Sequence, residues 1–292
     1  MFSEDFLHYL SGFHFSGDIY AIPEGTVVFP KEPLLKVVAP IMEAQLVETA
    51  ILNIINHQSL IATKTARVVF AAAGDGVMEF GLRRAQGPDA GLYGARAAMI
   101  GGCIGTSNVL AGQMFDVPVK GTHAHSWIMS FADEYTAFKT YAKLYPDACC
   151  LLVDTYDTLK SGVPNAIKVF TEMRESGIEL HNYGIRLDSG DLAYLSKKAR
   201  KMLDEAGFED AFISASNDLD EYLIHDLKIQ GAAITSWGVG TNLITSKDCP
   251  SFGGVYKLAA IQKEDGKFHS KIKLSENTEK ITNPGNKTVY RI

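Results

Sequence analysis

The chain has 292 residues, 46% of them hydrophobic, so it can bury a full-sized core, which argues against a disordered chain. Its net charge of −6 and the absence of long Lys/Arg runs argue against nucleic-acid binding, because that needs a basic face to neutralise phosphates. The four cysteines show no CxxC spacing, and Cys149 and Cys150 sit in an apolar run, so we expect buried thiols in a reducing cytoplasm.

The sequence predicts neither a signal peptide nor a membrane span. Glu4, Asp5 and His8 stand where a cleavable signal peptide would place basic and then apolar residues. The most apolar window, residues 90–112, is interrupted by Arg96 and by glycines, which makes it a poor transmembrane candidate. We therefore expect a cytoplasmic protein that binds no membrane.

Strands and turns are predicted for the first 40 residues. Short apolar runs at residues 26–29 and 34–38 are separated by glycine and proline turn formers. From Pro40 to Gly74 apolar residues recur at helical spacing, and proline favours a helix start. This region is therefore predicted to be one long helix, or two helices joined near residues 58–59.

After Gly74, strand-like runs alternate with helical stretches in a pattern typical of an α/β fold. Parallel strands need such helical crossovers between them, and the repetition predicts a barrel. The predicted strands cover residues 77–82, 117–121, 149–153, 183–187, 211–214 and 232–237. The predicted helices cover residues 132–144, 163–176, 191–206 and 219–228.

The tail returns to short alternating runs with a turn at residues 283–285. Its predicted strands cover residues 255–258 and 270–274. We assign it to an antiparallel element that pairs with the opening segment. The chain is therefore expected to form a β-rich accessory domain from residues 1–40 and 253–292, and an α/β barrel domain from residues 41–252.

Polar clusters at the predicted strand ends form the candidate site, because barrel enzymes build their active sites from the loops that follow the strands. Glu79 and Arg83 lie around the first of these strands. A carboxylate and a guanidinium there suit a polar substrate. A surface ion-pair group explains this segment equally well.

Two imidazoles, His123 and His125, follow Thr122 in one short segment. Residues two apart on a strand point the same way, so both imidazoles could face one site. The pair could hold a metal, or one imidazole could act as a nucleophile or acid–base group, since imidazole is partly neutral near physiological pH. A histidine that is merely hydrogen-bonded inside the barrel is the structural alternative.

Carboxylates follow two of the later strands. Asp154 and Asp157 suit ribose hydroxyls or a magnesium-bound diphosphate, although helix capping explains Asp157 nearly as well. Arg186 and Asp188 share a face at the end of the next strand. A guanidinium is a planar fork that matches a carboxylate, and Asp188 could approach a hydroxyl or magnesium.

Gly238, Gly240 and Thr241 directly follow the last predicted strand. Glycines at this place let backbone amides approach a phosphate without obstruction by a side chain. Such a loop alone is weak evidence. It gains weight because residues 216–218 are polar and end the neighbouring strand, so both loops reach the same rim.

Taken in order, these motifs resemble the nicotinate phosphoribosyltransferase family along nearly the whole chain. The resemblance rests on segments 21–25, 80–84, 121–125, 186–191 and 238–241. It implies an irregular TIM-like α/β barrel with a smaller, discontinuous β-rich domain, usually in a homodimer. It also implies that nicotinate and phosphoribosyl pyrophosphate are joined, with ATP hydrolysis and magnesium, to give nicotinate mononucleotide and pyrophosphate in NAD biosynthesis.

The resemblance assigns roles to the matching residues. His125 matches the histidine that ATP phosphorylates, and it forms the expected catalytic pair with Asp188. Thr122 and Arg186 match contacts to nicotinate. The expected site for the phosphate of the phosphoribosyl group is made by Gly238, Gly240 and Thr241. The remaining expected substrate-binding residues are Glu79, Arg83 and Asp157.

Members of this family generally begin further upstream, with an aromatic residue that closes over the nicotinate ring, and this chain also stops soon after its carboxyl-terminal β element begins. We therefore expect the chain to be shortened at both ends. One alternative is a truncated, non-catalytic subunit that keeps ligand binding. Another is half of a split enzyme whose missing segments come from a separate polypeptide. A metal-dependent barrel hydrolase would use His123 and His125 as ligands, but His181 and His225 downstream do not follow predicted strands.

Overall fold

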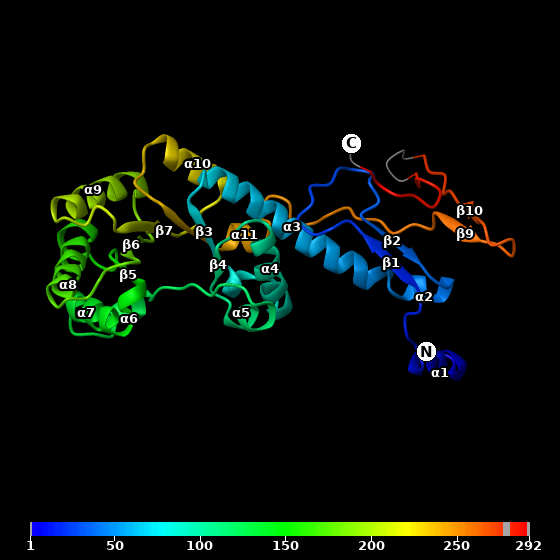
Figure 1. Ribbon diagram of the computed structural model, residues 1–292, viewed down its shortest axis with the longest axis horizontal. Helices are drawn as coiled ribbons and strands as arrows, with labels where there is room; N and C mark the ends of the chain where they lie inside the picture. The colour runs from blue at the N-terminus through cyan, green and yellow to red at the C-terminus, as the bar shows by residue number, and fades with distance from the viewer. Residues whose placement is uncertain (1, 277–280, 291–292) are drawn as a thin grey trace. The chain divides into compact units, whose positions relative to one another are not determined.

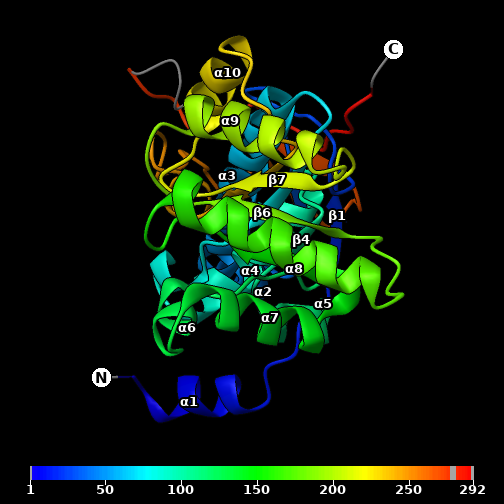
Figure 2. The same cartoon turned by 90° about the vertical axis from the view of Figure 1, so that its left-hand side faces the viewer.

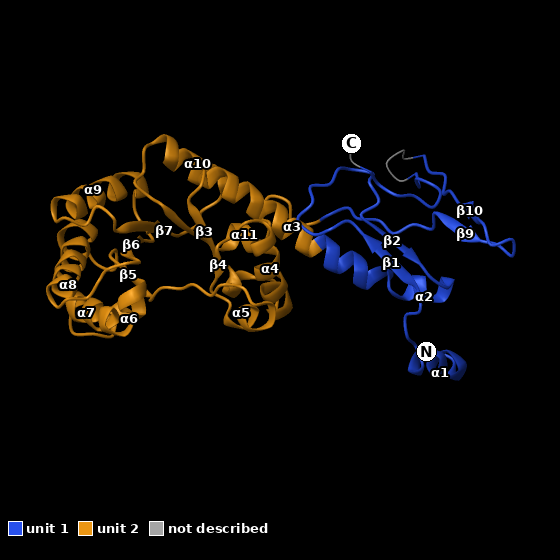
Figure 3. Cartoon of the chain, in the orientation of Figure 1, with its two compact units in different colours: residues 1–56, 252–292 blue, residues 57–251 orange. Residues whose placement is uncertain are grey.

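The computed structural model describes residues 2–276 and 281–290. The chain divides into two compact units (Figure 3). The larger unit consists of residues 57–251, and the smaller consists of residues 1–56 together with residues 252–292.

The first boundary between the units lies after Asn56, inside helix α3 (Glu48–Ala72), rather than after Pro40 as predicted. The tail accounts for this difference, because it packs on the helices that precede Asn56. The hydroxyl of Tyr256 donates to the carbonyl oxygen of Ala44 at 3.0 Å. These helices therefore group with the tail rather than with the barrel.

The larger unit is built on a six-stranded parallel sheet that curls into a half-barrel (Figure 1). Its strand order is β4-β3-β8-β7-β6-β5, and within the described residues the edge strands β4 and β5 do not pair with each other. The strands are β3 (Gly76–Glu79), β4 (Gly105–Thr106), β5 (Cys149–Leu152), β6 (Tyr183–Leu187), β7 (Phe212–Ala215) and β8 (Ser236–Val239). The predicted α/β class is thereby confirmed.

Helices cover the outside of the curled sheet, where α8 and α9 cross in front of β6 and β7 (Figure 2). The helices that follow α3 are α4 (Pro88–Ile100), α5 (Val109–Phe115), α6 (His125–Met129), α7 (Glu134–Leu144), α8 (Val163–Glu175), α9 (Leu192–Glu205), α10 (Glu221–Ile229) and α11 (Thr241–Ile244), with the short turns η1 (Leu82–Arg84), η2 (Pro146–Ala148) and η3 (Thr158–Gly162). Aspartate caps set three of the starts, because Asp133, Asp191 and Asp220 each accept a backbone N–H of the first turn. Among the described residues, no helix is long and apolar enough to cross a bilayer.

The core lies between the strands and this helical layer. Strands covered on both faces are apolar throughout, and β5 is accordingly buried along its whole length. The rings of Phe170, Tyr183 and Phe208 pack edge to face, with centroids 5.0 to 6.0 Å apart. Trp237 is fully buried and satisfies its indole N–H by donating to Asp75 at 2.9 Å.

The cysteines only partly match the expectation of buried thiols. Cys103, Cys149 and Cys150 are buried and free, whereas Cys249 is exposed. Burial raises the pKa of Cys149 and of Cys150 to about 12, so these two groups remain thiols at neutral pH.

Ion pairs join α3 to α10 and to the segment that follows α11, and the pair of Lys64 with Glu221 is buried. The ammonium of Lys64 lies 2.7 Å from Glu221, at the start of α10, and 2.6 Å from Asp248. Burial disfavours the charged form of Lys64, but its two carboxylate partners outweigh burial and raise its pKa. Arg67 adds contacts of 2.9 Å to Glu221 and 3.0 Å to Asp248.

Some predicted elements differ from the structure. Residues 117–121 form no strand, and only Val119 makes a single parallel bridge to Thr106 in β4, because Pro118 has no N–H with which to continue a ladder. The last strand of the parallel sheet is β8, at residues 236–239 rather than 232–237. By contrast, the strand predicted at 183–187 and the four predicted helices are confirmed, the helices with ends shifted by one or two residues.

The smaller unit combines two antiparallel strand pairs with helices. Its elements are α1 (Glu4–Ser11), β1 (Asp18–Ala21), β2 (Leu35–Val38), α2 (Ile41–Leu46), the first part of α3, β9 (Ala260–Gln262) and β10 (Phe268–Ser270). β1 pairs with β2, and β9 pairs with β10 through a turn in which Gly266 has a φ of 74°. The ammonium of Lys36 in β2 donates to the Asn286 side chain at 2.9 Å, which joins this strand to the tail.

Candidate active site

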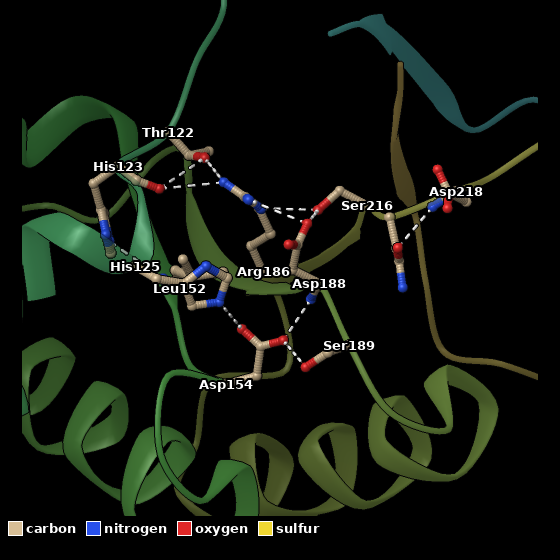
Figure 4. A network of polar contacts seen from close by, with 11 residues as sticks. Thr122, His123, His125, Leu152, Asp154, Arg186, Asp188, Ser189, Ser216 and Asp218 are labelled. Atoms are coloured by element: carbon tan, nitrogen blue, oxygen red, sulfur yellow. Dashed lines mark hydrogen bonds and ion pairs between the residues drawn. The ribbon is translucent and has the colours of Figure 1, made fainter. Parts of the chain in front are cut away.

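Polar side chains gather where β5, β6 and β7 end, beside the segment that joins α5 to α6 (Figure 4). The carboxyl ends of parallel strands meet at one rim, which is where barrel enzymes place their active sites. The cluster consists of Thr122, His123, His125, Asp154, Arg186, Asp188, Ser189 and Ser216.

The guanidinium of Arg186 is the centre of the cluster, and 15% of this side chain is exposed. Its Nε donates to the Ser216 hydroxyl at 2.9 Å. One terminal nitrogen donates to the Thr122 hydroxyl and, at 3.2 Å, to the carbonyl oxygen of His123. The other lies 3.2 Å from Asp188 Oδ1. Four of the five guanidinium N–H groups thus have partners among the described residues, and the fifth has none among them.

Asp154, two residues beyond β5, joins the ends of two strands. Its side chain is only 2% exposed. Its Oδ2 accepts from the backbone N–H of Asp188 at 2.9 Å and from the Ser189 hydroxyl at 2.6 Å. Its Oδ1 lies 3.2 Å from Nε2 of His125. One carboxylate therefore connects β5, the loop after β6, and α6.

His125 is the first residue of α6, and 38% of its side chain is exposed. When its Nε2 donates to Asp154, the proton of the neutral ring lies on Nε2 and the lone pair lies on Nδ1. A ring held by a carboxylate and carrying a free nitrogen lone pair is equipped to act as a nucleophile.

His123 has a different environment from His125, and the structure gives the two imidazoles different partners. Its ring is buried against Tyr141, with ring centroids 4.5 Å apart. Its Nε2 accepts from the backbone N–H of Leu152 at 3.2 Å. Burial, assisted by the charge of Arg186, lowers the pKa of His123 to about 4, so this imidazole is neutral at physiological pH.

The end of β8 and the loop after it, residues 238–241, have little room for side chains. A Cβ placed on Gly238 would lie 2.6 Å from the Phe80 ring, and a Cβ placed on Gly240 would lie 3.2 Å from the Phe80 carbonyl oxygen. Thr241 follows as the first residue of α11. Glycine at these two positions lets the backbone of β8 lie directly against the segment after β3.

This loop is also fixed to the loop after β7. The side-chain amide of Asn242 donates to the carbonyl oxygens of Asp218 and Leu219, at 3.1 and 3.0 Å. A Cβ on Gly238 would lie 3.5 Å from that of Ser216, which itself contacts Arg186. The glycine loop therefore borders the polar cluster.

Glu79 and Arg83 lie outside the contacts of this cluster. Glu79 is completely buried at the end of β3, where it accepts from the Thr106 hydroxyl at 2.6 Å and from the amide of Gly81. Burial outweighs these two hydrogen bonds and raises the pKa of Glu79. Arg83 lies exposed on η1. The carboxylate of Glu79 thus connects β3 with β4.

Asp157 caps η3, as the alternative explanation of this residue proposed. Its carboxylate accepts from the backbone N–H groups of Leu159 and Lys160, at 3.2 and 2.9 Å. These hydrogen bonds, with the charge of Lys160 nearby, lower the pKa of Asp157. Of the two carboxylates after β5, Asp154 is the one that lies in the cluster.

The described residues offer the metal-hydrolase alternative no ligand set. Among them, no three His, Cys, Asp or Glu side chains gather in a way that could hold a metal ion. His123 is paired with Leu152, and His125 is paired with Asp154. Further along the chain, His181 lies at the surface, 3.2 Å from Glu179.

Asp154 and Ser216 follow predicted strands, but neither was among the residues to which the resemblance assigned a catalytic or binding role. The strand register pairs Leu152 with Arg186 and Arg186 with Ser214. Two residues further along these three strands stand Asp154, Asp188 and Ser216. They share one level above the sheet, so knowledge of the register would have identified both missing residues.

Comparison with known proteins relates the chain to one family. The model of the nicotinate phosphoribosyltransferase N-terminal domain matches residues 1–56, and the model of the nicotinate phosphoribosyltransferase family matches residues 76–280. A nicotinate phosphoribosyltransferase of Bacillus subtilis is 58% identical over 291 residues, covering 100% of this chain and 58% of the relative. One of Mycobacterium tuberculosis is 46% identical over 290 residues, covering 99% of this chain and 60% of the relative. The chain thus spans 58 to 60% of the length of these relatives.

Two solved structures have a similar fold. Human nicotinic acid phosphoribosyltransferase aligns with a TM-score of 0.74 and 32% identity, covering 82% of this chain and 58% of that chain. A nicotinate-nucleotide pyrophosphorylase from Pyrococcus furiosus aligns with a TM-score of 0.67 and 29% identity, covering 80% and 58%. The half-barrel therefore has the TIM-like fold of these proteins.

The lowered pKa of His123 predicts a pH-dependent stability. An unfolded histidine binds a proton near pH 6.5, whereas folded His123 does so near pH 4. The free energy of unfolding should therefore fall as the pH drops from about 6.5 to about 4. The variant His123→Gln lacks this titration, and the fall should be larger in the unmodified chain than in the variant by up to about 3 kcal/mol. Urea unfolding of both proteins across this range measures the difference. Equal falls in both proteins would contradict the assignment.

The crowded glycine loop predicts a contrast between two alanine substitutions. Gly238→Ala forces a Cβ against the Phe80 ring and should cost about 1–3 kcal/mol of unfolding free energy. Gly121→Ala is the matched control, because a Cβ there meets no atom within 4 Å, and it should cost less than about 1 kcal/mol. Denaturant unfolding measures both costs. A cost for Gly238→Ala no greater than that of the control would show that the loop can move aside.

Proposed function

Because the chain belongs to the nicotinate phosphoribosyltransferase family, we propose that it transfers the phosphoribosyl group of phosphoribosyl pyrophosphate to nicotinate. The products are nicotinate mononucleotide and pyrophosphate, formed with hydrolysis of ATP as a step of NAD biosynthesis. The observation that carries this proposal is the half-buried Arg186, which has one N–H available beside the His125–Asp154 pair.

Arg186 and Thr122 are proposed to hold the carboxylate of nicotinate. A carboxylate entering the site meets a fixed cation whose remaining N–H can donate to it. The hydroxyl of Thr122 already contacts the guanidinium, so it lies within reach of the same ligand. Arg186 then provides one charge-assisted hydrogen bond rather than the two-pronged contact expected from its shape alone.

His125 is proposed to accept the phosphoryl group of ATP. The Nδ1 lone pair attacks the γ-phosphorus, a nitrogen–phosphorus bond forms, and the bond to the ADP oxygen breaks. Asp154 holds the ring and stabilises its positive charge during the attack. The phosphorylated ring then adds about two negative charges next to Arg186, which changes the electrostatics of the site until the group is hydrolysed.

The glycine loop and Asp188 are proposed to bind phosphoribosyl pyrophosphate. Gly238, Gly240 and Thr241 offer backbone amides and a hydroxyl to the phosphate of the phosphoribosyl group. Magnesium is usually held by one or two carboxylates together with substrate phosphates, and the 30%-exposed carboxylate of Asp188 fits this preference. When bound, the ion neutralises charge on the departing diphosphate.

In the transfer step the ring nitrogen of nicotinate forms a bond to C1 of the ribose while the bond from C1 to the diphosphate oxygen breaks. The ribose becomes cation-like as the diphosphate leaves. A carboxylate near C1 stabilises such a charge, and Asp188 is the proposed group because it stands on the same rim as Arg186.

The active assembly is proposed to be a homodimer. Helix α5 exposes the apolar side chains of Val109, Leu110 and Met114, by 70%, 51% and 54%. Neighbouring exposed apolar side chains mark interaction surfaces, and twofold dimers are the commonest assemblies.

The proposed activity predicts that purified chain, given nicotinate, phosphoribosyl pyrophosphate, ATP and magnesium, forms nicotinate mononucleotide. His125→Ala should abolish the ATP-dependent part of this activity, because it removes the phosphoryl acceptor. His181→Ala is the control and should behave like the unmodified chain, since His181 is exposed and, within the described part of the chain, pairs only with Glu179. Chromatography of the nucleotide product measures all three. If the folded, unmodified chain forms no product, the proposal is overturned for this chain acting alone.

The proposed nicotinate contact predicts a ligand-specific effect of Arg186→Ala. Its dissociation constant for nicotinate should rise by roughly 10- to 100-fold, because a charge-assisted hydrogen bond is lost. The affinity for phosphoribosyl pyrophosphate should change far less. Titration calorimetry measures both, with nicotinamide as a ligand that lacks the carboxylate. Equal losses for the two substrates would contradict the assignment.

A further inference from the structure

The open edge of the half-barrel contains a buried imidazole that the proposed reaction does not use. Within the described residues, strand β5 pairs only with β6, so its other side faces the gap between β5 and β4. A backbone N–H on that side has no neighbouring strand to accept its hydrogen. An unpaired buried N–H is costly, so some other group must accept from it.

His123 is that acceptor. Its Nε2 takes the hydrogen bond from the backbone N–H of Leu152, at 3.2 Å. The ring is buried and packs against Tyr141 and Phe138, with centroids 4.5 and 6.2 Å away. An imidazole nitrogen can accept only when it carries no proton, so the contact requires the neutral ring.

The backbone of His123 also serves the candidate site. Its carbonyl oxygen accepts from the guanidinium of Arg186 at 3.2 Å. Thr122, which contacts the same guanidinium, precedes it, and His125 follows two residues later. The position of His123 therefore affects where both Thr122 and His125 lie.

The same segment is anchored to the opposite edge of the gap. The amide of Thr106 in β4 donates to the carbonyl oxygen of Pro118 at 3.0 Å, and the amide of Lys120 donates back to Thr106 at 2.9 Å. Residues 118–123 therefore reach from β4 to β5. The β4 end is held by backbone pairing, whereas the contact with β5 itself is made by the side chain of His123, beside the Arg186 hydrogen bonds from β6.

We propose that His123 is a positioning residue, whose imidazole takes the place of a neighbouring strand for β5 and thereby sets Thr122 and His125 relative to Arg186 and Asp154. This inference rests on the proposed function for the roles of Thr122 and His125. The effect of His123 on the positions of Thr122 and His125 can be measured without any turnover of substrate.

Two substitutions separate the acceptor from the bulk of the ring. His123→Phe keeps an aromatic ring against Tyr141 but cannot accept a hydrogen bond. His123→Gln places a carbonyl oxygen close to where Nε2 stands and can accept from Leu152. Circular dichroism and thermal unfolding establish that each variant is folded before it is compared.

The first readout needs no substrate. In His123→Phe, hydrogen exchange of the Leu152 amide should be faster by about tenfold or more, because its acceptor is gone. The NMR signals of the His125 ring and of the Arg186 Nε–H should shift. His123→Gln should restore the protection of Leu152 and most of the two signals.

The second readout uses the site. The dissociation constant of His123→Phe for nicotinate should rise about tenfold, the rate of His125 phosphorylation by ATP should fall, and Gln should rescue both. If the unmodified chain binds no nicotinate and is not phosphorylated, the proposed function is contradicted. The hydrogen-exchange and NMR comparisons would still show whether His123 positions Thr122 and His125. Unchanged Leu152 exchange and unchanged NMR signals in the Phe variant would overturn the inference, as would a folded Gln variant that fails as Phe does.

Discussion

The half-buried positive charge of Arg186 is the constraint around which the candidate site is arranged. A guanidinium out of water must have acceptors for its hydrogens, and it draws them from three places. Ser216 comes from the end of β7, Asp188 from the loop after β6, and Thr122 with the His123 carbonyl from the segment across the open edge. The guanidinium of Arg186 therefore has its acceptors only when this rim is folded, and its hydrogen bonds hold the three parts of the rim together.

The charged and titratable side chains around Arg186 differ in their hydrogen-bond partners. Asp188 faces the guanidinium, whereas the buried carboxylate of Asp154 is held by a backbone N–H, a serine hydroxyl and the imidazole of His125. The other imidazole, His123, stays neutral because burial and the nearby Arg186 charge disfavour its protonation. His123 and His125 thus differ in burial and in hydrogen-bond partner, although each contacts a residue in or just after β5.

Much of this arrangement followed from the sequence, and the exceptions have physical causes. The strand at 183–187 was predicted correctly, and the polar residues after it share a face because strands alternate every two residues. Asp154 could not be chosen over Asp157 from local pattern, since both follow the same apolar run and only the pairing of β5 with β6 brings Asp154 level with Asp188. The expected strand at 117–121 is reduced to one bridge at Val119, because Pro118 has no N–H with which to continue the pairing with β4.

The open edge between β4 and β5 makes the half-barrel unevenly stiff. Between its other neighbouring strands, separation would break ladders of backbone hydrogen bonds that must give way together. At the open edge, among the described residues, widening the gap breaks either the short pairing around Val119 or the contacts of the 118–123 segment with Leu152 and Arg186, and it leaves the register of every strand pair intact. The sheet is therefore most easily opened at this edge, because no ladder between neighbouring strands has to separate there.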